Sequence, residues 1–234
     1  MEIKGSVALV TGANRGFGRA LAAALLDRGA AKVYAAVRRP ETVDLPGVVP
    51  LALDVTDPAS VRAAAAAAPD VTLLVNNAGV STGATFLDGA VEDVRLEMET
   101  HYFGPLNTTR AFAPVLAANG GGAVLNVLSV LAWVTLPHVN AYSAGKAAAL
   151  QLTNGLRLAL RDQGTLVTAL HVGYMDTEMA ADITDAKSDP AHIASLALDG
   201  LKRDDFEIVA DDVSRQVRAG LSGELVGLYP QLAS

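Results

Sequence analysis

Residues 7–18 read VALVTGANRGFG, and this stretch decides the fold. An apolar run is followed by Gly12, Gly16 and Gly18 and then by an alanine- and leucine-rich segment. That order predicts a strand, a tight loop and a helix. Glycine lets a backbone approach a ligand closely, and the free N–H groups at a helix N-terminus favour phosphate. The stretch therefore predicts a dinucleotide site, and a glycine turn that binds no ligand is the alternative.

The next residues complete a βαβ unit. Residues 19–28 predict a helix that Gly29 terminates in the C′ position, and the apolar run 32–37 predicts a second strand. A unit of this length is half of a Rossmann fold. The surroundings of the glycine loop therefore favour the dinucleotide site over a bare turn.

Size and composition narrow the class of protein. The chain has 234 residues, 51% of them hydrophobic and 18% charged, and we expect a single domain over residues 1–234. No apolar run is long enough to span a bilayer, and no leader pattern precedes the first strand. The absence of cysteine excludes disulfides, thiolate metal sites and a cysteine nucleophile. We expect a cytoplasmic protein without a metal ion.

The net charge is −7, and lysine and arginine are not clustered over a long stretch. We therefore expect neither a nucleic-acid nor a membrane partner. Against this acidic background, Arg15 lies in the glycine loop, and Arg38 and Arg39 follow the second predicted strand. They are candidates for binding a phosphate, and three solvated arginines are the alternative.

Strand and helix patterns alternate to the end of the chain. Further strands are expected at 48–55, 71–75, 123–128, 166–172 and 206–210, and further helices at 58–68, 90–100, 102–118, 141–161, from 190 and at 211–221. Asp57 and Asp189 each precede a proline and suit the N-cap position. This alternation predicts the α/β class, as a Rossmann-type doubly wound parallel sheet with helices on both faces.

Polar or small residues follow the predicted strands at their carboxyl ends, where ligands bind in such sheets. Beyond the glycine loop, they are Arg38 and Arg39, Asp54 and Val55, Asn76, Asn77, Ala78 and Gly79, Ser129, and Val172 and Gly173 with Thr177 a little further on. A sheet with a purely structural role does not need such residues at every end. We therefore expect the functional site at this edge.

Tyr142 and Lys146 lie four residues apart, on one face of the predicted helix 141–161, and Ser129 ends the strand before it. A free tyrosine titrates about three units too high to act near neutral pH, a deficit of roughly 4 kcal/mol. An ammonium about 4 Å away contributes on the order of 4 kcal/mol at an effective dielectric near 20. We therefore expect Lys146 to lower the pKa of Tyr142. With Ser129 bound to a developing oxyanion, the set suits hydride transfer to a carbonyl and proton donation by Tyr142.

These features together resemble the short-chain dehydrogenase/reductase family over nearly the whole chain. The motifs are TGANRGFG at 11–18, NNAG at 76–79, Ser129, and YSAGK at 142–146. The resemblance implies a nicotinamide cofactor, with Tyr142 as acid/base, Lys146 on the nicotinamide ribose and Ser129 on the substrate. It implies that Asp54 and Val55 flank the adenine, Asn76 the adenosine ribose and Thr177 the carboxamide. The cofactor-binding residues that we expect are Gly12, Asn14, Arg15, Gly16, Phe17, Gly18, Arg38, Asp54, Val55, Asn76, Ala78, Gly79, Tyr142, Lys146, Gly173 and Thr177.

The chain departs from the family pattern at two places. His101 occupies the position where the family usually has an asparagine that holds a proton-relaying water, and Val172 replaces the usual proline before Gly173. A histidine there is a candidate for the catalytic set as a proton relay, and a structural histidine is the alternative. The lost proline is expected to loosen the loop over the nicotinamide without abolishing binding.

The residues after the second strand predict NADP(H). Sites that prefer NAD place an acid about 20 residues beyond the glycine loop, on the ribose 2′-hydroxyl. Arg38 stands there instead, and a guanidinium pairs with a 2′-phosphate. Arg15 is expected to reach the same phosphate.

The expected substrate is an apolar ketone, aldehyde or secondary alcohol. The residues that would line its site are mostly apolar, and several of them are equally consistent with core positions: Tyr174, Met175, Met179 and Ile183 on one side, and Val80, Leu131, Trp133, Leu136, His138 and Val139 on the other. The sequence does not name the substrate.

The leading hypothesis is thus an NADPH-dependent carbonyl reductase that also runs as an alcohol dehydrogenase. One alternative is a non-catalytic NADP-binding regulatory protein on the same fold. Another is a sugar-nucleotide epimerase or dehydratase, which usually has a larger C-terminal domain. The resemblance also implies a homodimer or homotetramer.

Overall fold

Seven parallel strands form one sheet in this computed structural model, which describes residues 1–233. In spatial order the strands are β3 (Val49–Ala52), β2 (Lys32–Val37), β1 (Val7–Thr11), β4 (Leu73–Asn76), β5 (Ala123–Val127), β6 (Leu166–His171) and β7 (Glu207–Val209). The chain builds outward from β1 to β3, then returns to the other side of β1 with β4, so the order reverses between β1 and β4. The arrangement confirms the Rossmann-type doubly wound fold.

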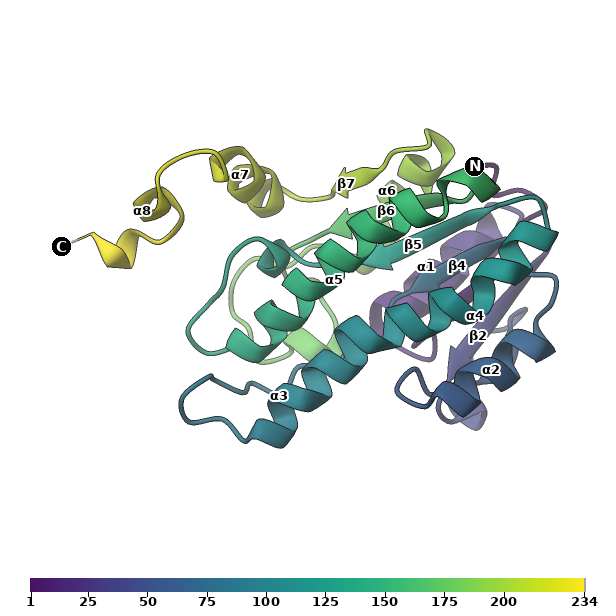
Figure 1. Cartoon of the computed structure of the whole chain (residues 1–234), viewed down its shortest axis with the longest axis horizontal. Coiled ribbons are helices and arrows are strands. Elements are labelled where there is room, and N and C mark those ends of the chain that lie inside the picture. The colour runs from purple at the N-terminus through teal and green to yellow at the C-terminus, as the bar shows by residue number, and fades with distance from the viewer. Residues whose placement is uncertain (234) are drawn as a thin grey trace.

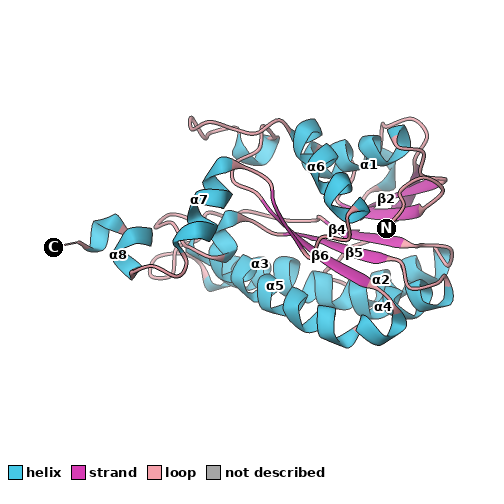
Figure 2. Cartoon of the chain, turned by 90° about the horizontal axis from the view of Figure 1, so that it is seen from above, coloured by secondary structure: helices cyan, strands magenta, loops and turns pink. Residues whose placement is uncertain are grey.

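Helices cover both faces of the sheet, as Figure 2 shows. One face packs against α1 (Gly16–Asp27) and α6 (Pro190–Lys202), and the other against α2 (Pro58–Ala67), α4 (Gly104–Ala118) and α5 (Asn140–Ala159). The central strands β4 and β5 are buried at every position. Continuous burial explains why these strands are mostly apolar, because a strand covered on both faces has no solvent side. Their two polar residues, Asn76 and Asn126, are hydrogen-bonded to each other at 2.8 Å.

The predicted cap residues agree with the structure, although α1 begins at Gly16 and not at residue 19 as expected. Asp57 caps α2 by accepting a hydrogen bond from the N–H of Ala59 at 2.8 Å, and Asp189 caps α6 in the same way. Gly29 follows α1 with φ of 79°, as expected of a C′ glycine. These local signals position the helices, and through them the loops at the carboxyl edge of the sheet.

The helices expected at 90–100 and 102–118 are one continuous segment with an irregular middle. It consists of α3 (Val91–Met98), a π-helical turn (Glu99–Phe103) and α4. Gly104 follows the turn, and a Cβ on it would lie 3.1 Å from the Val55 side chain, so this segment packs tightly against the loop after β3. Such π turns occur frequently at functional sites, and this one carries His101.

The C-terminal part adds α7 (Asp212–Gly220) and α8 (Leu225–Leu228), of which only α7 was predicted. Figure 1 shows α8 standing away from the sheet. Short 3₁₀ helices complete the described chain at Pro40–Thr42, Val130–Ala132, Arg161–Gln163, Glu178–Ala180 and Pro230–Leu232. Within residues 1–233, no helix has both the length and the apolar character needed to cross a membrane.

Candidate active site

The glycine loop between β1 and α1 is shaped for close backbone approach. Gly12 has φ of 69° and Gly16 has φ of 52°, both in the left-handed region that favours glycine. A Cβ on Gly18 would lie 2.3 Å from the Gly12 carbonyl oxygen. Arg15, at the N-cap of α1, does not use its side chain as a cap. The first N–H groups of α1 are therefore open to an anion, as a phosphate site requires.

The loop after β4 is clamped to the glycine loop. The hydroxyl of Thr11 accepts hydrogen bonds from the N–H groups of Asn77 and Ala78, both at 2.9 Å. The Asn77 amide donates to the Thr11 carbonyl at 2.9 Å, and a Cβ on Gly12 would meet the Ala78 Cα at 3.1 Å. The two sequence motifs therefore form one rigid surface at the switch point of the sheet.

The four residues expected to be catalytic come together at the ends of β5 and α5. Ser129 begins the 3₁₀ turn after β5, where its hydroxyl accepts from the N–H of Leu131 at 3.1 Å. The Lys146 ammonium donates to the Val127 carbonyl at 2.8 Å and lies 5.6 Å from the Tyr142 ring centroid. The rings of Tyr142 and His101 meet edge-on, with their centroids 5.0 Å apart.

The acid–base state of this group differs from the sequence-based expectation. Burial raises the pKa of Tyr142 above its ordinary value, with the Ser129 hydroxyl opposing the shift. Burial also lowers the pKa of Lys146 to about 8. The predicted lowering of the Tyr142 pKa is therefore wrong for the protein by itself, because desolvation by burial dominates and the Glu97 carboxylate adds to it. Tyr142 is held in its protonated form.

A buried pair behind this group was missed by the sequence reasoning. Glu97, on α3, is wholly inaccessible to solvent, and its carboxylate lies 3.0 Å from Nε2 of His101. The same Nε2 lies 2.8 Å from the Val80 carbonyl oxygen. The signal available in the sequence was the Glu-x-x-x-His spacing from 97 to 101, which places both side chains on one helical face.

The Asn76 side chain is held by hydrogen bonds within the protein. Its side chain is buried and donates to the Asn126 oxygen at 2.8 Å, while its own oxygen accepts from Thr108 at 2.6 Å. A second hydrogen bond, to Thr109, uses the remaining amide hydrogen. Because these partners lie on β5 and α4, the Asn76 amide joins β4 to β5 and to α4.

Other expected cofactor residues lie around the same edge. Thr177 approaches Gly16, since a Cβ on that glycine would lie 3.6 Å from it. Arg15 pairs with Glu178, and Asn14 donates to Thr42 at 3.1 Å.

Two more of these residues are fixed by nearby polar groups. The N–H of Gly173 donates to the Asp211 carboxylate at 2.6 Å, a contact that sequence reasoning missed. Asp54 accepts from the Thr56 hydroxyl at 2.7 Å. Arg38 is exposed, and the part of the chain that the structure describes offers it no ion pair.

The expected substrate wall is more tightly packed than the sequence indicated. The Trp133 ring stacks on His171 with centroids 3.8 Å apart, and Arg218 lies 5.9 Å from the same tryptophan ring. Leu131 is 8% exposed. His171 in turn donates from Nδ1 to the Ser129 carbonyl at 3.1 Å. Part of this wall therefore supports the Ser129 turn.

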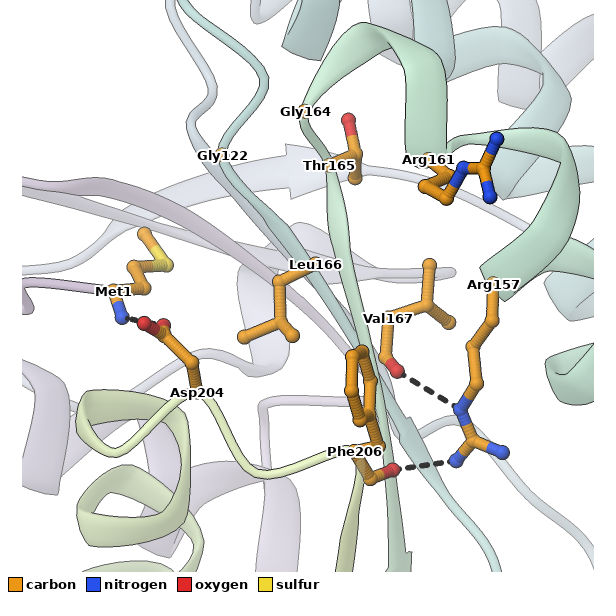
Figure 3. A pocket seen from close by; sticks show the side chains of 10 residues that line it. All are labelled: Met1, Gly122, Arg157, Arg161, Gly164, Thr165, Leu166, Val167, Asp204 and Phe206. Atoms are coloured by element: carbon orange, nitrogen blue, oxygen red, sulfur yellow. Dashed lines mark hydrogen bonds and ion pairs between the residues drawn. The ribbon is translucent and has the colours of Figure 1, made fainter.

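A larger pocket lies away from the residues predicted to be catalytic. It has a volume of about 440 Å³ and lies at the amino ends of β5 and β6, at the opposite edge of the sheet (Figure 3). Arg157 lines it and donates to the carbonyls of Val167 and Phe206. Its guanidinium therefore joins strand ends, and the cavity contains none of the residues predicted to be catalytic.

Comparison with known proteins agrees with this geometry. The family described as "short chain dehydrogenase" matches residues 6–188. This chain belongs to that family. The Oxidoreductase UcpA of Escherichia coli (strain K12) is 31% identical over 223 residues, covering 90% of this chain and 84% of that protein.

Solved structures of the family superpose closely on this chain. A short chain dehydrogenase from Burkholderia cenocepacia J2315, in complex with NADP, has a TM-score of 0.95 and 41% identity, with 100% of both chains covered. A short chain dehydrogenase/reductase from Burkholderia phymatum, in complex with NAD, has a TM-score of 0.83 and 25% identity, with 93% of both chains covered. The family and the fold expected from the sequence are both confirmed.

Proposed function

We propose that this short-chain dehydrogenase is an NADPH-dependent carbonyl reductase that also oxidises secondary alcohols. The observation that carries the proposal is the convergence of Ser129, Tyr142 and Lys146 at the carboxyl ends of the strands. Lys146 lies 5.6 Å from the Tyr142 ring centroid, and Ser129 follows the strand that holds the lysine's carbonyl partner. A nicotinamide supplies or accepts the hydride when it is bound.

The glycine loop fits a dinucleotide. A side chain on Gly18 would collide with the loop backbone, and the first turn of α1 offers N–H groups to a phosphate. The other residues that we propose for the same cofactor are Gly12, Gly16, Ala78, Gly79, Gly173 and Thr177. Arg38 supports NADP(H) over NAD(H), because an exposed guanidinium past β2 suits a 2′-phosphate and no acid stands in its place.

Ser129, Tyr142 and Lys146 each have a separate role in the proposed reaction. The Ser129 hydroxyl binds the carbonyl oxygen of the substrate as negative charge develops on it. Tyr142 donates its proton to that oxygen, and burial keeps the phenol protonated until this transfer. Lys146 places a positive charge beside the phenol and so stabilises the phenolate that proton donation leaves.

The proposed substrate is an uncharged ketone or aldehyde with an apolar substituent. The proposal rests on the apolar residues of Trp133 and the segment after β6, where Met179 is 56% exposed. The intact set of Ser129, Tyr142 and Lys146 argues against the non-catalytic regulatory alternative, and the departure from the family pattern at His101 is the feature that favours it.

We also propose a homodimer or homotetramer. Exposed apolar side chains cluster on and before α3, where Phe86, Leu87, Val91 and Leu96 are 60%, 94%, 56% and 42% exposed. Patches of this kind mark interaction surfaces. Light scattering of the purified protein tests this; a monomer at all concentrations would contradict it.

The function is tested by a panel of aliphatic and aryl ketones and aldehydes, with NADPH oxidation as the readout. Wild type and Tyr142→Phe are assayed in parallel, and both are first shown to bind NADPH. We expect turnover by the wild type and a loss of at least about 100-fold in the variant, because general acid catalysis contributes that much. NADPH binding without turnover on the whole panel would favour the regulatory alternative.

A further inference from the structure

Glu97 is the only buried residue of α3, and its side chain is wholly inaccessible. One carboxylate oxygen accepts hydrogen bonds from the N–H of Thr82 at 2.7 Å and from the Thr82 hydroxyl at 3.0 Å. The other oxygen faces His101 at 3.0 Å. Glutamate is almost never fully buried unless it is paired, because removing a carboxylate from water is costly. This burial therefore needs a compensating charge.

The geometry around His101 fixes where its proton sits. Nε2 faces two oxygen atoms, the Val80 carbonyl at 2.8 Å and the Glu97 carboxylate at 3.0 Å. Neither oxygen has a proton to give if Glu97 is ionised, so Nε2 carries the hydrogen. Nδ1 is then the lone-pair nitrogen of a neutral ring. It is buried and has no hydrogen-bond partner among the described residues.

Nδ1 belongs to a ring that lines a small space next to Lys146. A cavity of about 10 Å³ lies among Asn76, His101, Asn126 and Lys146, with Val127 and Leu128 behind it. That volume holds about one water molecule. The His101 ring and the Lys146 side chain therefore line the same small space.

The charges around this space balance only with Glu97 included. The titratable groups that face this space come from four elements. They are Glu97 on α3, His101 on the π turn, Tyr142 and Lys146 on α5, and Tyr174 on the loop after β6, which raises the pKa of Tyr142. Burial alone would raise the pKa of Glu97, but the nearby His101 imidazole and the hydrogen bonds from Thr82 outweigh it, and the pKa falls below its ordinary value. Oε2 itself, 3.0 Å from His101, has no hydrogen-bond partner among the described residues, because the Nε2–H is directed to the Val80 carbonyl. Burial and the charge of Lys146 lower the pKa of His101. At neutral pH the group is a carboxylate, a neutral imidazole and an ammonium.

We propose that Glu97 is a positioning residue for the carbonyl reduction assigned above: its carboxylate holds His101 with the proton on Nε2 and keeps Lys146 and Tyr142 protonated. The expected effect on the pH profile rests on the proposed function. The placement of His101 rests on the contacts between Glu97 and His101 alone. The competing explanation is that Glu97 only ties the Thr82 loop to α3.

The test is the pH profile of kcat/KM for ketone reduction by wild type and Glu97→Gln. The 3.0 Å and 5.0 Å contacts through His101 place the carboxylate on the order of 10 Å from the Tyr142 hydroxyl. A unit charge at that distance shifts a pKa by about one unit at an effective dielectric near 20. Removing the negative charge makes protonation of its neighbours less favourable. The alkaline limb of the profile should therefore move down by about one pH unit.

The matched control is Glu99→Gln, which removes the same charge from an exposed position two residues further along. Its profile should coincide with that of the wild type. A Glu97→Gln enzyme that folds, binds NADPH and keeps the wild-type profile would show that the glutamate only ties a loop.

A second readout needs no turnover. Titration of the Lys146 ε-carbon by NMR should give a midpoint about one unit lower in Glu97→Gln than in wild type. In the wild type alone, the ¹⁵N spectrum of His101 should show a neutral ring with hydrogen on Nε2. A proton on Nδ1, or a cationic ring at neutral pH, would overturn the proposal, even if Glu97→Gln does not fold.

The two ideas fail separately. Full activity in Tyr142→Phe, or no turnover on any carbonyl, would refute the proposed function, and the NMR results would then decide the role of Glu97. An inactive Tyr142→Phe together with an unshifted Glu97→Gln profile would refute only the inference.

Discussion

Gly18→Ala should be among the most damaging single-methyl additions in the glycine loop. Gly18 lies in the first turn of α1, directly beside the loop backbone that it follows. A Cβ at this position would lie 2.3 Å from the Gly12 carbonyl oxygen and 2.5 Å from the Asn77 amide nitrogen. Contacts below 3 Å are not tolerated between such atoms, so either the loop or α1 must move.

The loss of stability in Gly18→Ala can be estimated from these contacts. Forcing one extra methyl into a packed site costs about 1–3 kcal/mol. Displacing Asn77 also disturbs its hydrogen bond to the Thr11 carbonyl at 2.9 Å, which is worth about 1 kcal/mol. We therefore expect the free energy of unfolding to fall by about 2–4 kcal/mol. NADPH affinity should fall as well, because the loop that moves is the proposed phosphate site.

Gly155→Ala is the matched control. Gly155 lies in α5, is exposed, and a Cβ there meets nothing within 4 Å. Alanine in a helix interior is better than glycine by about 0.5–1 kcal/mol, so this variant should be slightly more stable than wild type. Urea unfolding followed by circular dichroism measures both. If Gly18→Ala were as stable as wild type and bound NADPH as tightly, the close approach of loop and helix would be refuted.

Three further predictions concern other parts of the molecule. Arg38→Asp should raise the Kd for NADPH by at least about 10-fold, since one charged hydrogen bond is worth over about 1.4 kcal/mol. The Kd for NADH should stay nearly unchanged. Fluorescence titration measures both Kd values, and equal changes in them would contradict the NADP assignment. Burial lowers the pKa of His171 to about 4. Between that pH and about 6.5, the unfolded chain therefore binds a proton at His171 that the folded chain does not bind. The free energy of unfolding should fall by up to roughly 3 kcal/mol as the pH is lowered through this range. His171→Gln should flatten this slope in urea unfolding at several pH values. Asp189→Ala should cost about 1 kcal/mol in the same assay, because it removes the cap on the N–H groups of Ala191 and His192.

The fold was accessible from the sequence because its signals are local. Strand β2 was predicted with the bounds that the structure has, and Asp57 and Asp189 mark helix starts through hydrogen bonds to backbone groups two or three residues away. The break at residues 99–103 was anticipated only as a gap between two helices. Its π geometry depends on how Gly104 packs against Val55, more than 45 residues away in the chain, and no local pattern encodes such a contact.

In the site too, the residues could be predicted from local motifs, but some of their contacts could not. Ser129, Tyr142 and Lys146 carry a recognisable spacing, so their convergence followed once the sheet was assumed. Asn76 also carries a recognisable motif, but its partners on β5 and α4 come from distant segments. A motif identifies the residue type that a position needs. Which neighbour uses that side chain is decided by packing.

The pKa of Tyr142 cannot be predicted from the Tyr142–Lys146 pair alone. Considered as an isolated pair, an ammonium 5.6 Å from the ring contributes about 3 kcal/mol at an effective dielectric near 20, which would lower the phenol's pKa. Desolvation of the same phenol acts in the opposite direction, and the buried carboxylate of Glu97 adds to it. The balance therefore depends on a residue whose burial nothing in the YSAGK motif encodes. For reduction this balance is favourable, because the proton needed by the carbonyl oxygen stays on Tyr142 until charge develops beside Ser129. The same reasoning implies that oxidation of an alcohol, which needs the phenolate, should have its optimum at higher pH than reduction.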